Sequence, residues 1–255
     1  MNKKQFTIDL NCDMGEGLDT DKEIMPYISS ANIACGYHAG DEATILKTVA
    51  YCLQYNVAIG AHPGFDDRTN FGRREIRMEL SALYDLVTVQ VDRVKTIAEK
   101  SGGRLYHVKP HGALYNMAAA DETYAHVLAQ AVKDVDHRLL FYGLSNSALI
   151  TAATVAGLQP AAEVFADRTY QDNGQLTPRS HPQALIAEQT AALAQVLELV
   201  QEKRVRTLSG TTIKMPTDTI CLHGDGAHAV AFAQIIYQKL NEQGICIERI
   251  QRIND

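Results

Sequence analysis

Short apolar segments alternate with longer amphipathic segments along most of the chain. The short segments are apolar throughout, as strands buried on both faces of a sheet should be. In the longer ones apolar residues recur at helical spacing, for example at Ile45, Val49 and Leu53. The pattern predicts seven strands, at residues 6–12, 31–35, 57–62, 104–108, 139–144, 162–166 and 219–222. It predicts six helices, at residues 41–55, 78–101, 121–135, 146–156, 182–203 and 227–243.

The alternation of strands and helices predicts a parallel sheet with right-handed crossovers. A closed barrel and an open doubly wound sheet would both satisfy it. Polar residues follow nearly every predicted strand. A barrel gathers all of its strand ends at one face, whereas an open sheet gathers only those near its switch point. We therefore expect an irregular seven-stranded (β/α) barrel, similar to a TIM barrel. No linker, low-complexity tract or internal repeat is visible, so we expect one domain over residues 1–255.

The amino-acid composition and the charge exclude several classes of protein. Apolar residues make up 46% of the 255 residues, enough for a sizeable core, and the net charge is −6 with no basic block. Duplex nucleic acid requires a cationic footprint, so we expect no nucleic-acid partner. No apolar run reaches 18 residues, and polar residues follow the N-terminal lysines too soon for an export signal. The five cysteines form no CxxC pair, which argues against a structural zinc site. These features predict a cytoplasmic protein with reduced thiols and no membrane partner.

The first predicted strand places three polar side chains on one face. Side chains alternate along a strand, so Asp9, Asn11 and Asp13 point the same way. Two carboxylates and an amide facing inward are costly unless they are hydrogen-bonded or solvated. We expect Asp9, the deepest, to be structural and Asn11 to contact substrate. Asp13, nearest the strand end, is a candidate catalytic residue.

The second and third strand ends add further candidates. Asn32, Cys35 and His38 belong to or follow the second strand and are candidate substrate contacts. A buried cysteine is more often a small hydrophobe, so Cys35 has that alternative role. His62 closes the third strand and is a candidate acid or base. Arg73, in the long loop that follows, could meet a substrate carboxylate in a bidentate fork or could be a solvated residue at the helix entry.

A lysine and a histidine flank a proline where the fourth strand ends. Packing alone does not explain such residues at a buried strand end. Lys109 is the best single candidate for holding an anion or stabilising an oxyanion. His111 is a candidate acid or base. The alternative for Lys109 is a structural ion pair with an aspartate.

The last two strands also end in polar residues. Three candidate substrate contacts lie in or just after the sixth strand: Glu163, Asp167 and Arg168. Asp167 and Arg168 could instead pair with each other. After the seventh strand, His223 is a candidate catalytic residue and Asp225 a candidate substrate contact. Between strand and helix, Gly224 and Gly226 could present backbone N–H groups to a phosphate, although this glycine pattern alone is a weak signal. No P-loop sequence occurs anywhere in the chain.

In their order along the chain, these segments resemble the LamB/YcsF family. The ordered set is highly specific and covers the chain almost from end to end: residues 9–17, 30–41, 58–64, 108–116, 163–168 and 223–225. The resemblance implies a barrel of the type seen in some sugar hydrolases and polysaccharide deacetylases. It also implies a subunit of an ATP-dependent 5-oxoprolinase, which opens the ring of 5-oxo-L-proline (pyroglutamate) to L-glutamate while ATP is hydrolysed to ADP and phosphate. Two further subunits, B and C, are implied as partners.

The implied reaction explains the need for partners. A five-membered lactam is an unreactive amide, and phosphorylating its oxygen creates an imidate-like species that water can attack. ATP must therefore act before hydrolysis. Because the chain lacks a P-loop, we expect it to open the ring while its partners supply at least part of the ATP step; ATP could still contact residues 224–226.

Two other functions remain open from the sequence. One is a metal-dependent, deacetylase-like hydrolase in which a divalent ion is held by Asp13, His38, His62 and His223. The other is a non-catalytic binding subunit of a carboxylase-like assembly. In that case, replacing Lys109 or His111 would leave assembly and flux unchanged.

Overall fold

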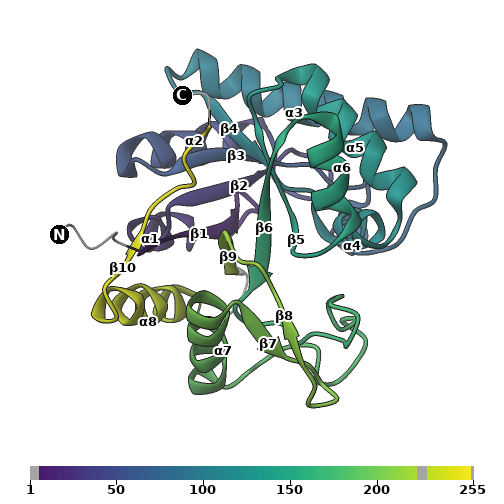
Figure 1. The fold of residues 1–255 in the computed structure, drawn as a ribbon. Coiled ribbons are helices and arrows are strands. Elements are labelled where there is room, and N and C mark those ends of the chain that lie inside the picture. The colour runs from purple at the N-terminus through teal and green to yellow at the C-terminus, as the bar shows by residue number, and fades with distance from the viewer. Residues whose placement is uncertain (1–5, 223–228, 254–255) are drawn as a thin grey trace.

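The computed structural model describes residues 6–222 and 229–253, and seven parallel strands in these ranges close into a barrel (Figure 1). The strands follow one another around the barrel, and the last pairs with both the sixth and the first. They are β1 (Phe6–Met14), β2 (Ser30–Ala34), β3 (Ala58–His62), β4 (Leu105–Val108), β5 (Leu140–Leu144), β6 (Gln159–Phe165) and β9 (Thr219–Leu222). The predicted barrel and its seven strands are confirmed.

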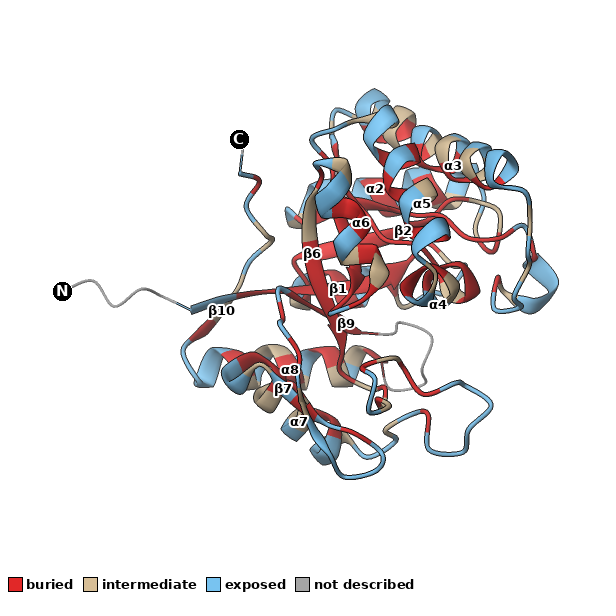
Figure 2. Ribbon diagram, turned by 45° about the vertical axis from the view of Figure 1, so that its right-hand side comes forward, coloured by how far each residue is buried: buried red, intermediate tan, exposed pale blue. Residues whose placement is uncertain are grey.

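The helices lie outside the barrel and bury one face against it, as the alternating buried and exposed turns in Figure 2 show. The six predicted helices are present as α2 (Glu42–Tyr55), α3 (Leu80–Lys100), α5 (Glu122–Val135), α6 (Ala148–Ala156), α7 (Gln189–Glu202) and α8 (Ala229–Glu242). Asp41 caps α2 by accepting a hydrogen bond from the backbone N–H of Thr44. None of the helices in the described ranges is both long enough and apolar enough to cross a bilayer.

The sequence pattern did not predict several short helices and strands, because they are too brief or too uniformly apolar to show a periodic spacing of apolar residues. They are α1 (Asp21–Ile24), η1 (Met25–Tyr27), η2 (Arg68–Asn70), α4 (Gly112–Ala120), β7 (Arg204–Arg206), β8 (Thr212–Lys214) and β10 (Ile245–Ile247). Of these, α4 matters most for the site, because it begins directly after His111. The strand β10 pairs with the start of β1, beside the barrel.

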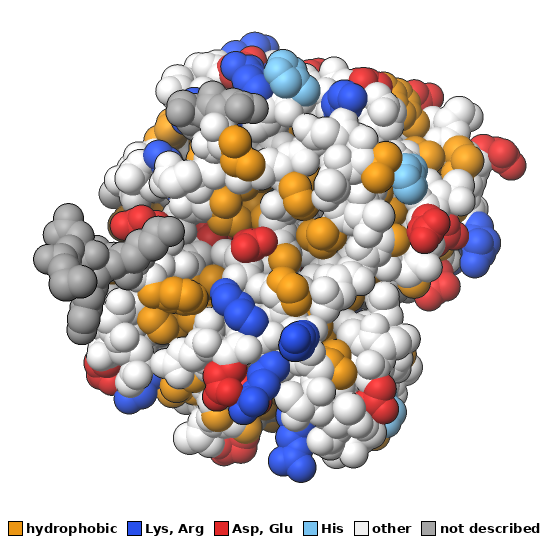
Figure 3. Space-filling model, viewed as in Figure 1, with side chains coloured by type: hydrophobic (Ala, Val, Ile, Leu, Met, Phe, Trp, Pro, Cys, Tyr) orange, Lys and Arg blue, Asp and Glu red, His pale blue; other side chains and the backbone are white. Residues whose placement is uncertain are grey.

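The segment between β6 and β9 departs from the predicted helix at residues 182–203. Its first residues pair back onto the chain after β6 instead: the N–H of Ile186 donates to Asp167, and the carbonyl of Ala184 accepts from Thr169. The helix α7 therefore begins only at Gln189. The antiparallel hairpin of β7 and β8 follows. On the face in Figure 3, Lys and Arg side chains gather over the region where this hairpin lies in Figure 1.

The interior of the barrel changes from apolar to polar along the strands. At the amino ends of the strands lies a small apolar cluster that includes Tyr106, Leu140 and Tyr142. The C-terminal segment covers this end, because Arg252 donates to the carbonyls of Leu105 and Tyr106. At the other end the interior is polar, and the active-site candidates follow from that.

Alternation along β1 creates the polar interior. Leu10 and Cys12 belong to the core between barrel and helices, while Asp9, Asn11 and Asp13 make their hydrogen bonds inside the barrel. Asp9 accepts four hydroxyl hydrogen bonds, from Ser29, Ser30, Tyr142 and Thr219. Burial raises the pKa of the Asp9 carboxyl, and these hydrogen bonds oppose the rise. Asp9 therefore serves the fold, as the sequence predicted.

We expect Asp9→Asn to lower the free energy of unfolding by about 2–3 kcal/mol, because the new amide turns N–H groups toward buried hydroxyl donors. Denaturant unfolding measures this. The control is Asp172→Asn, since Asp172 also accepts hydroxyl hydrogen bonds from Thr207 and Ser209 but is exposed. The free energy of unfolding of that control variant should fall only slightly. Equal losses in the two variants would show that burial does not set the cost.

Candidate active site

A pocket opens at the carboxyl ends of β1, β3, β4 and β6. It is lined by Asp13, Glu16, His62, Arg73, Lys109, Pro110, His111, Gly112, Tyr115, Asn116, Phe165, Arg168 and Arg179. Four of the five catalytic candidates, Asp13, His62, Lys109 and His111, are thus brought together. The fifth, His223, lies outside the described residues, as do Gly224, Asp225 and Gly226.

Lys109 is the buried cation of the pocket floor, with 2% of its surface exposed. Its Nζ lies 2.9 Å from Asp13 Oδ1 and 2.9 Å from Glu163 Oε1. It also lies 2.9 Å from Cys221 Sγ and 3.4 Å from Asn11 Oδ1. Burial alone would lower the pKa of the ammonium, but the facing carboxylates outweigh burial and hold the pKa well above its usual value. Lys109 is therefore charged, and it lines the pocket while its ammonium contacts several acceptors below.

Beneath Lys109, two amides connect the strands. Asn32 Nδ2 donates to Asp13 Oδ1 (2.8 Å) and to Asn11 Oδ1 (2.7 Å), and Asn11 Nδ2 donates to Glu163 Oε1 (3.0 Å). His107 Nε2 donates to Asn32 Oδ1 at 2.7 Å, since an amide oxygen only accepts. A Cβ atom on Gly60 would lie 2.0 Å from His107 Nε2, so only glycine leaves room for this ring. Asn11, Asn32 and Glu163 are thus below the pocket rather than on its wall.

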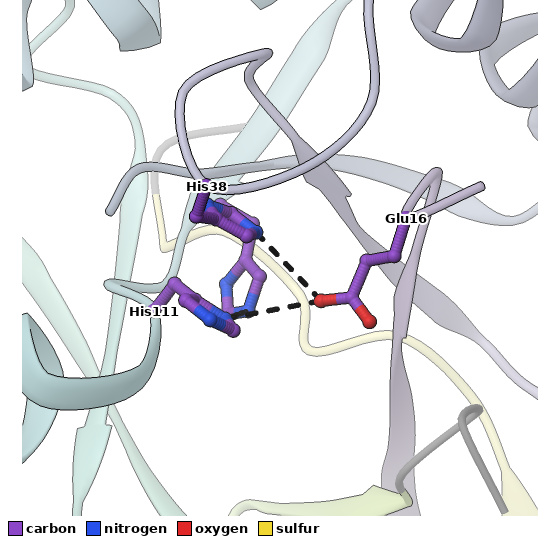
Figure 4. Close-up of side chains that lie close together, drawn as sticks. Glu16, His38 and His111 are labelled. Carbon is purple, nitrogen blue, oxygen red and sulfur yellow. Dashed lines mark hydrogen bonds and ion pairs between the residues drawn. The ribbon is translucent and has the colours of Figure 1, made fainter. Parts of the chain in front are cut away.

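Three histidines gather on one side of the pocket. The rings of His38 and His111 stack with centroids 3.7 Å apart and planes within 4°, and His62 meets both edge-on. Figure 4 shows the stacked His38 and His111 rings directed at the Glu16 carboxylate. Glu16 Oε1 lies 3.7 Å from His38 Nε2 and 3.8 Å from His111 Nδ1. A Cβ atom on Gly72, at φ +62°, would come within 2.8 Å of His38 Cβ, so the stack requires glycine there.

Backbone carbonyls fix two of the imidazoles. His62 Nδ1 lies 2.7 Å from the carbonyl oxygen of Lys109, and His111 Nε2 lies 2.8 Å from that of Phe71. Burial lowers the pKa of His38 to about 3, with a further contribution from His62. Burial and the neighbouring His38 also hold the pKa of His111 well below its usual value. The stacked rings are therefore neutral at pH 7.

Arginines line the mouth of the pocket. Arg73 places its guanidinium 4.9 Å from the centre of the Phe71 ring, and Arg168 donates to the carbonyl oxygens of Thr177 (2.6 Å) and Ala184 (3.3 Å). Burial, followed by the nearby Arg179, lowers the pKa of Arg168 to about 10, so it stays charged at pH 7. The mouth is therefore cationic, and it can receive a carboxylate or a phosphoryl group.

Some candidates lie away from the pocket wall. Cys35 is fully buried, its thiol donates to the carbonyl of Ile33, and burial raises its pKa to about 12, so it is a small core residue. Asp167 and His38 do not line the pocket, although His38 packs directly behind His111.

Sequence reasoning missed several lining residues, among them Glu16, Tyr115 and Arg179. Glu16 had a usable signal, because it lies three residues after Asp13, just past the end of β1. Tyr115 lies in the family-like segment 108–116, but the helix that carries it, α4, shows no apolar period that would orient its side chain.

The residues best arranged for a cation differ from the set suggested by the sequence. Glu16, His38, His62 and His111 each offer a ligand atom, and these four atoms lie within 4.8 Å of one another. Asp13 is instead engaged by Lys109, although its Oδ2 is 3.3 Å from His62 Nε2.

Comparison with known proteins agrees with this architecture. A model of the LamB/YcsF family matches residues 8–255. The chain belongs to the LamB/YcsF family. It is 54% identical over 246 residues to the A subunit of 5-oxoprolinase from Shouchella clausii (strain KSM-K16), covering 94% of this chain and 97% of that protein. The crystal structure of the lactam utilization protein from Thermus thermophilus is 36% identical, with a TM-score of 0.90 over 96% of this chain and 100% of that one.

A more distant structural similarity concerns the fold alone. A family 4 carbohydrate esterase from Streptomyces lividans is 14% identical and has a TM-score of 0.50 over 96% of this chain and 93% of that one. The two proteins share the barrel fold.

The burial of the thiols predicts their reactivity. Cys12, Cys35, Cys52 and Cys221 are buried, whereas Cys246 is half-buried. We expect a disulfide reagent such as DTNB to modify a single thiol rapidly in the native protein, and Cys246→Ser to abolish that reaction. Denaturant should release the remaining thiols. Rapid labelling of Cys35 in the native protein would contradict its assignment as a core residue.

Proposed function

We propose that this chain is the A subunit of an ATP-dependent 5-oxoprolinase and that it opens the ring of 5-oxo-L-proline together with B and C subunits. The observation that carries the proposal is the site itself: a buried ammonium between two carboxylates, beside imidazoles and under a cationic mouth. It occurs in a chain that is 54% identical to a protein named as the A subunit of 5-oxoprolinase. A carboxylate-bearing lactam suits such a site in charge and polarity.

The proposed overall reaction consists of bond changes for which the pocket offers suitable groups. The γ-phosphoryl group of ATP moves to the lactam oxygen, releasing ADP and leaving a C=N bond once the ring nitrogen loses its proton. Water adds to that carbon, the C–N bond breaks, and the nitrogen takes up protons. The product is an acyl phosphate, which a second water hydrolyses to glutamate and phosphate. Each water must lose a proton as it attacks, so the site needs a base.

Asp13 and His62 are suited to take the proton from the attacking water. Asp13 is held as a carboxylate by Lys109, and its second oxygen lies beside His62 Nε2 at 3.3 Å. Since His62 Nδ1 donates to a carbonyl, the Nε2 of the neutral ring carries a lone pair that can accept a proton. Lys109 stabilises the negative charge that develops on the oxygen. Arg73, on the wall of the pocket, is placed to hold the substrate carboxylate.

The ATP step falls mainly to the partners in this proposal. The sequence contains no P-loop, and residues 224–226, the candidate phosphate turn, lie outside the described residues. The cationic mouth suits a phosphorylated substrate that arrives from another subunit.

Reconstitution tests the proposed function. The chain should give no useful conversion of 5-oxoproline to glutamate by itself, and conversion should appear only when both partners and ATP are present. Glutamate formation and ADP release are measured with each component omitted in turn. Strong ATP-dependent turnover by the single chain would contradict the assignment of the ATP step, and no turnover with all components would contradict the function.

Lys109→Met separates a catalytic role from a structural one. Loss of a positioned electrostatic donor lowers a rate by roughly 10²–10³-fold. We expect that loss in the reconstituted complex, measured well below the melting temperature of the variant, which should itself be lower because methionine leaves the buried carboxylates of Asp13 and Glu163 without their cation. A variant with normal melting and most of its activity would exclude the catalytic role. One that simply unfolds would identify a structural Lys–Asp–Glu cluster.

A further inference from the structure

Two histidine nitrogens, Nε2 of His62 and Nδ1 of His111, face each other at hydrogen-bond distance. The carbonyl oxygens of Lys109 and Phe71 can only accept, so His62 Nδ1 and His111 Nε2 must carry the ring protons. In the neutral rings, His62 Nε2 and His111 Nδ1 then both present lone pairs. They lie 2.9 Å apart. Two lone pairs at that distance repel, so a positive species belongs between them: a shared proton or a metal ion.

The neighbouring groups favour a metal ion. His38 is fully buried, and neither of its ring nitrogens has a hydrogen-bond partner in the part of the chain that the structure describes. A buried polar group without a partner is costly, and a proton shared by the other two rings would leave His38 unsatisfied. Glu16 adds a carboxylate oxygen 3.7 Å from His38 Nε2 and 3.8 Å from His111 Nδ1, as the dashed lines in Figure 4 show.

We propose that Glu16, His38, His62 and His111 bind a divalent first-row transition-metal ion at the wall of the pocket. Ligand nitrogens about 2.1 Å from an ion stand about 3 Å apart when adjacent in an octahedral site and about 3.4 Å apart in a tetrahedral site. The distance of 2.9 Å between the facing nitrogens of His62 and His111 fits adjacent ligands, and all four ligand atoms lie within 4.8 Å of one another. Three imidazoles and one carboxylate suit Zn²⁺, Co²⁺ or Mn²⁺ and disfavour Mg²⁺ and Ca²⁺, which prefer oxygen ligands.

The surroundings of the rings match those of metal ligands. Histidines that bind metals generally donate their second N–H to a carbonyl or carboxylate, which fixes the tautomer and orients the lone pair. His62 and His111 do so through the carbonyls of Lys109 and Phe71. The stack of His38 on His111 is held by close packing against Gly72. Because the in-plane lone pairs of two parallel rings do not converge on one point, one of the two rings must turn as an ion binds.

An ion there would border the pocket, because Glu16, His62 and His111 all line it. Such an ion can polarise a substrate oxygen or lower the pKa of a bound water. A bound ion would occupy the His62 Nε2 lone pair, and Asp13 would then be the base in the proposed reaction. Metal binding is measured without substrate, so its failure is distinguishable from failure of the proposed 5-oxoprolinase reaction.

Metal binding is tested on the purified single chain, without partners or ATP. The protein is stripped with a chelator, exposed to Zn²⁺, Co²⁺ or Mn²⁺ with Mg²⁺ as the comparison ion, desalted and analysed by mass spectrometry of the metal. We expect one transition-metal ion per chain and a visible Co²⁺ absorption band. Excess ion, about a hundredfold over Kd, should raise the melting temperature by roughly 5–10 °C.

Matched variants locate the ion. Glu16→Gln and His111→Gln should each weaken binding by at least about tenfold, because a metal ligand contributes no less to affinity than the groups that orient it. The control is His126→Gln, since His126 is an exposed helix histidine whose ring bonds to the Glu122 carbonyl, and it should bind the ion as the native chain does. Circular dichroism of the metal-free variants checks their folding. Absence of bound ion in the native chain would overturn the proposal in favour of a shared proton, and equal binding by native and Glu16→Gln proteins would also overturn it.

Discussion

The end of the barrel that holds the candidate active site depends on one buried ammonium group. Lys109 has lost nearly all contact with water, and such a charge is tolerated only when anions and hydrogen-bond acceptors replace the solvent. Those partners come from different strands: Asp13 from β1, Glu163 from β6 and Cys221 from β9. They meet only if the sheet closes with β9 between β6 and β1. The polar interior and the closure of the barrel therefore require each other.

The same residue connects the floor of the pocket to the histidine cluster. The Lys109 side chain holds Asp13, while its backbone carbonyl accepts the N–H of His62. That second contact turns the lone pair of His62 toward His111, whose tautomer is fixed by Phe71 in the loop after β3. A shift of the chain at Lys109 would therefore disturb the carboxylate and the imidazoles together, and Pro110 restricts such a shift by fixing its own φ.

The sequence predicted the strands well and the contacts between them poorly. Uniformly apolar runs identify buried strands, and polar residues at their ends identified Asp13, His62, Lys109 and His111 as neighbours in a barrel. His107 escaped notice because it lies within a strand, where its partner Asn32 is known only once β2, β3 and β4 are aligned. The helix predicted from residue 182 was wrong at its start, since residues 184–186 pair with the chain after β6, which no local pattern reveals.

Charge is divided between the floor and the mouth of the pocket, and this division sets how a substrate can enter. The floor carries two carboxylates against the single charge of Lys109, and the Glu16 carboxylate lies beside the neutral histidines. The mouth carries arginine side chains, including Arg73 and Arg168. An anionic group is therefore attracted at the entrance and repelled by the excess negative charge below, unless a metal ion offsets it. In the proposed reaction, a phosphorylated lactam would accordingly keep its phosphoryl and carboxylate groups near the arginines and turn its reacting carbon toward Asp13 and His62.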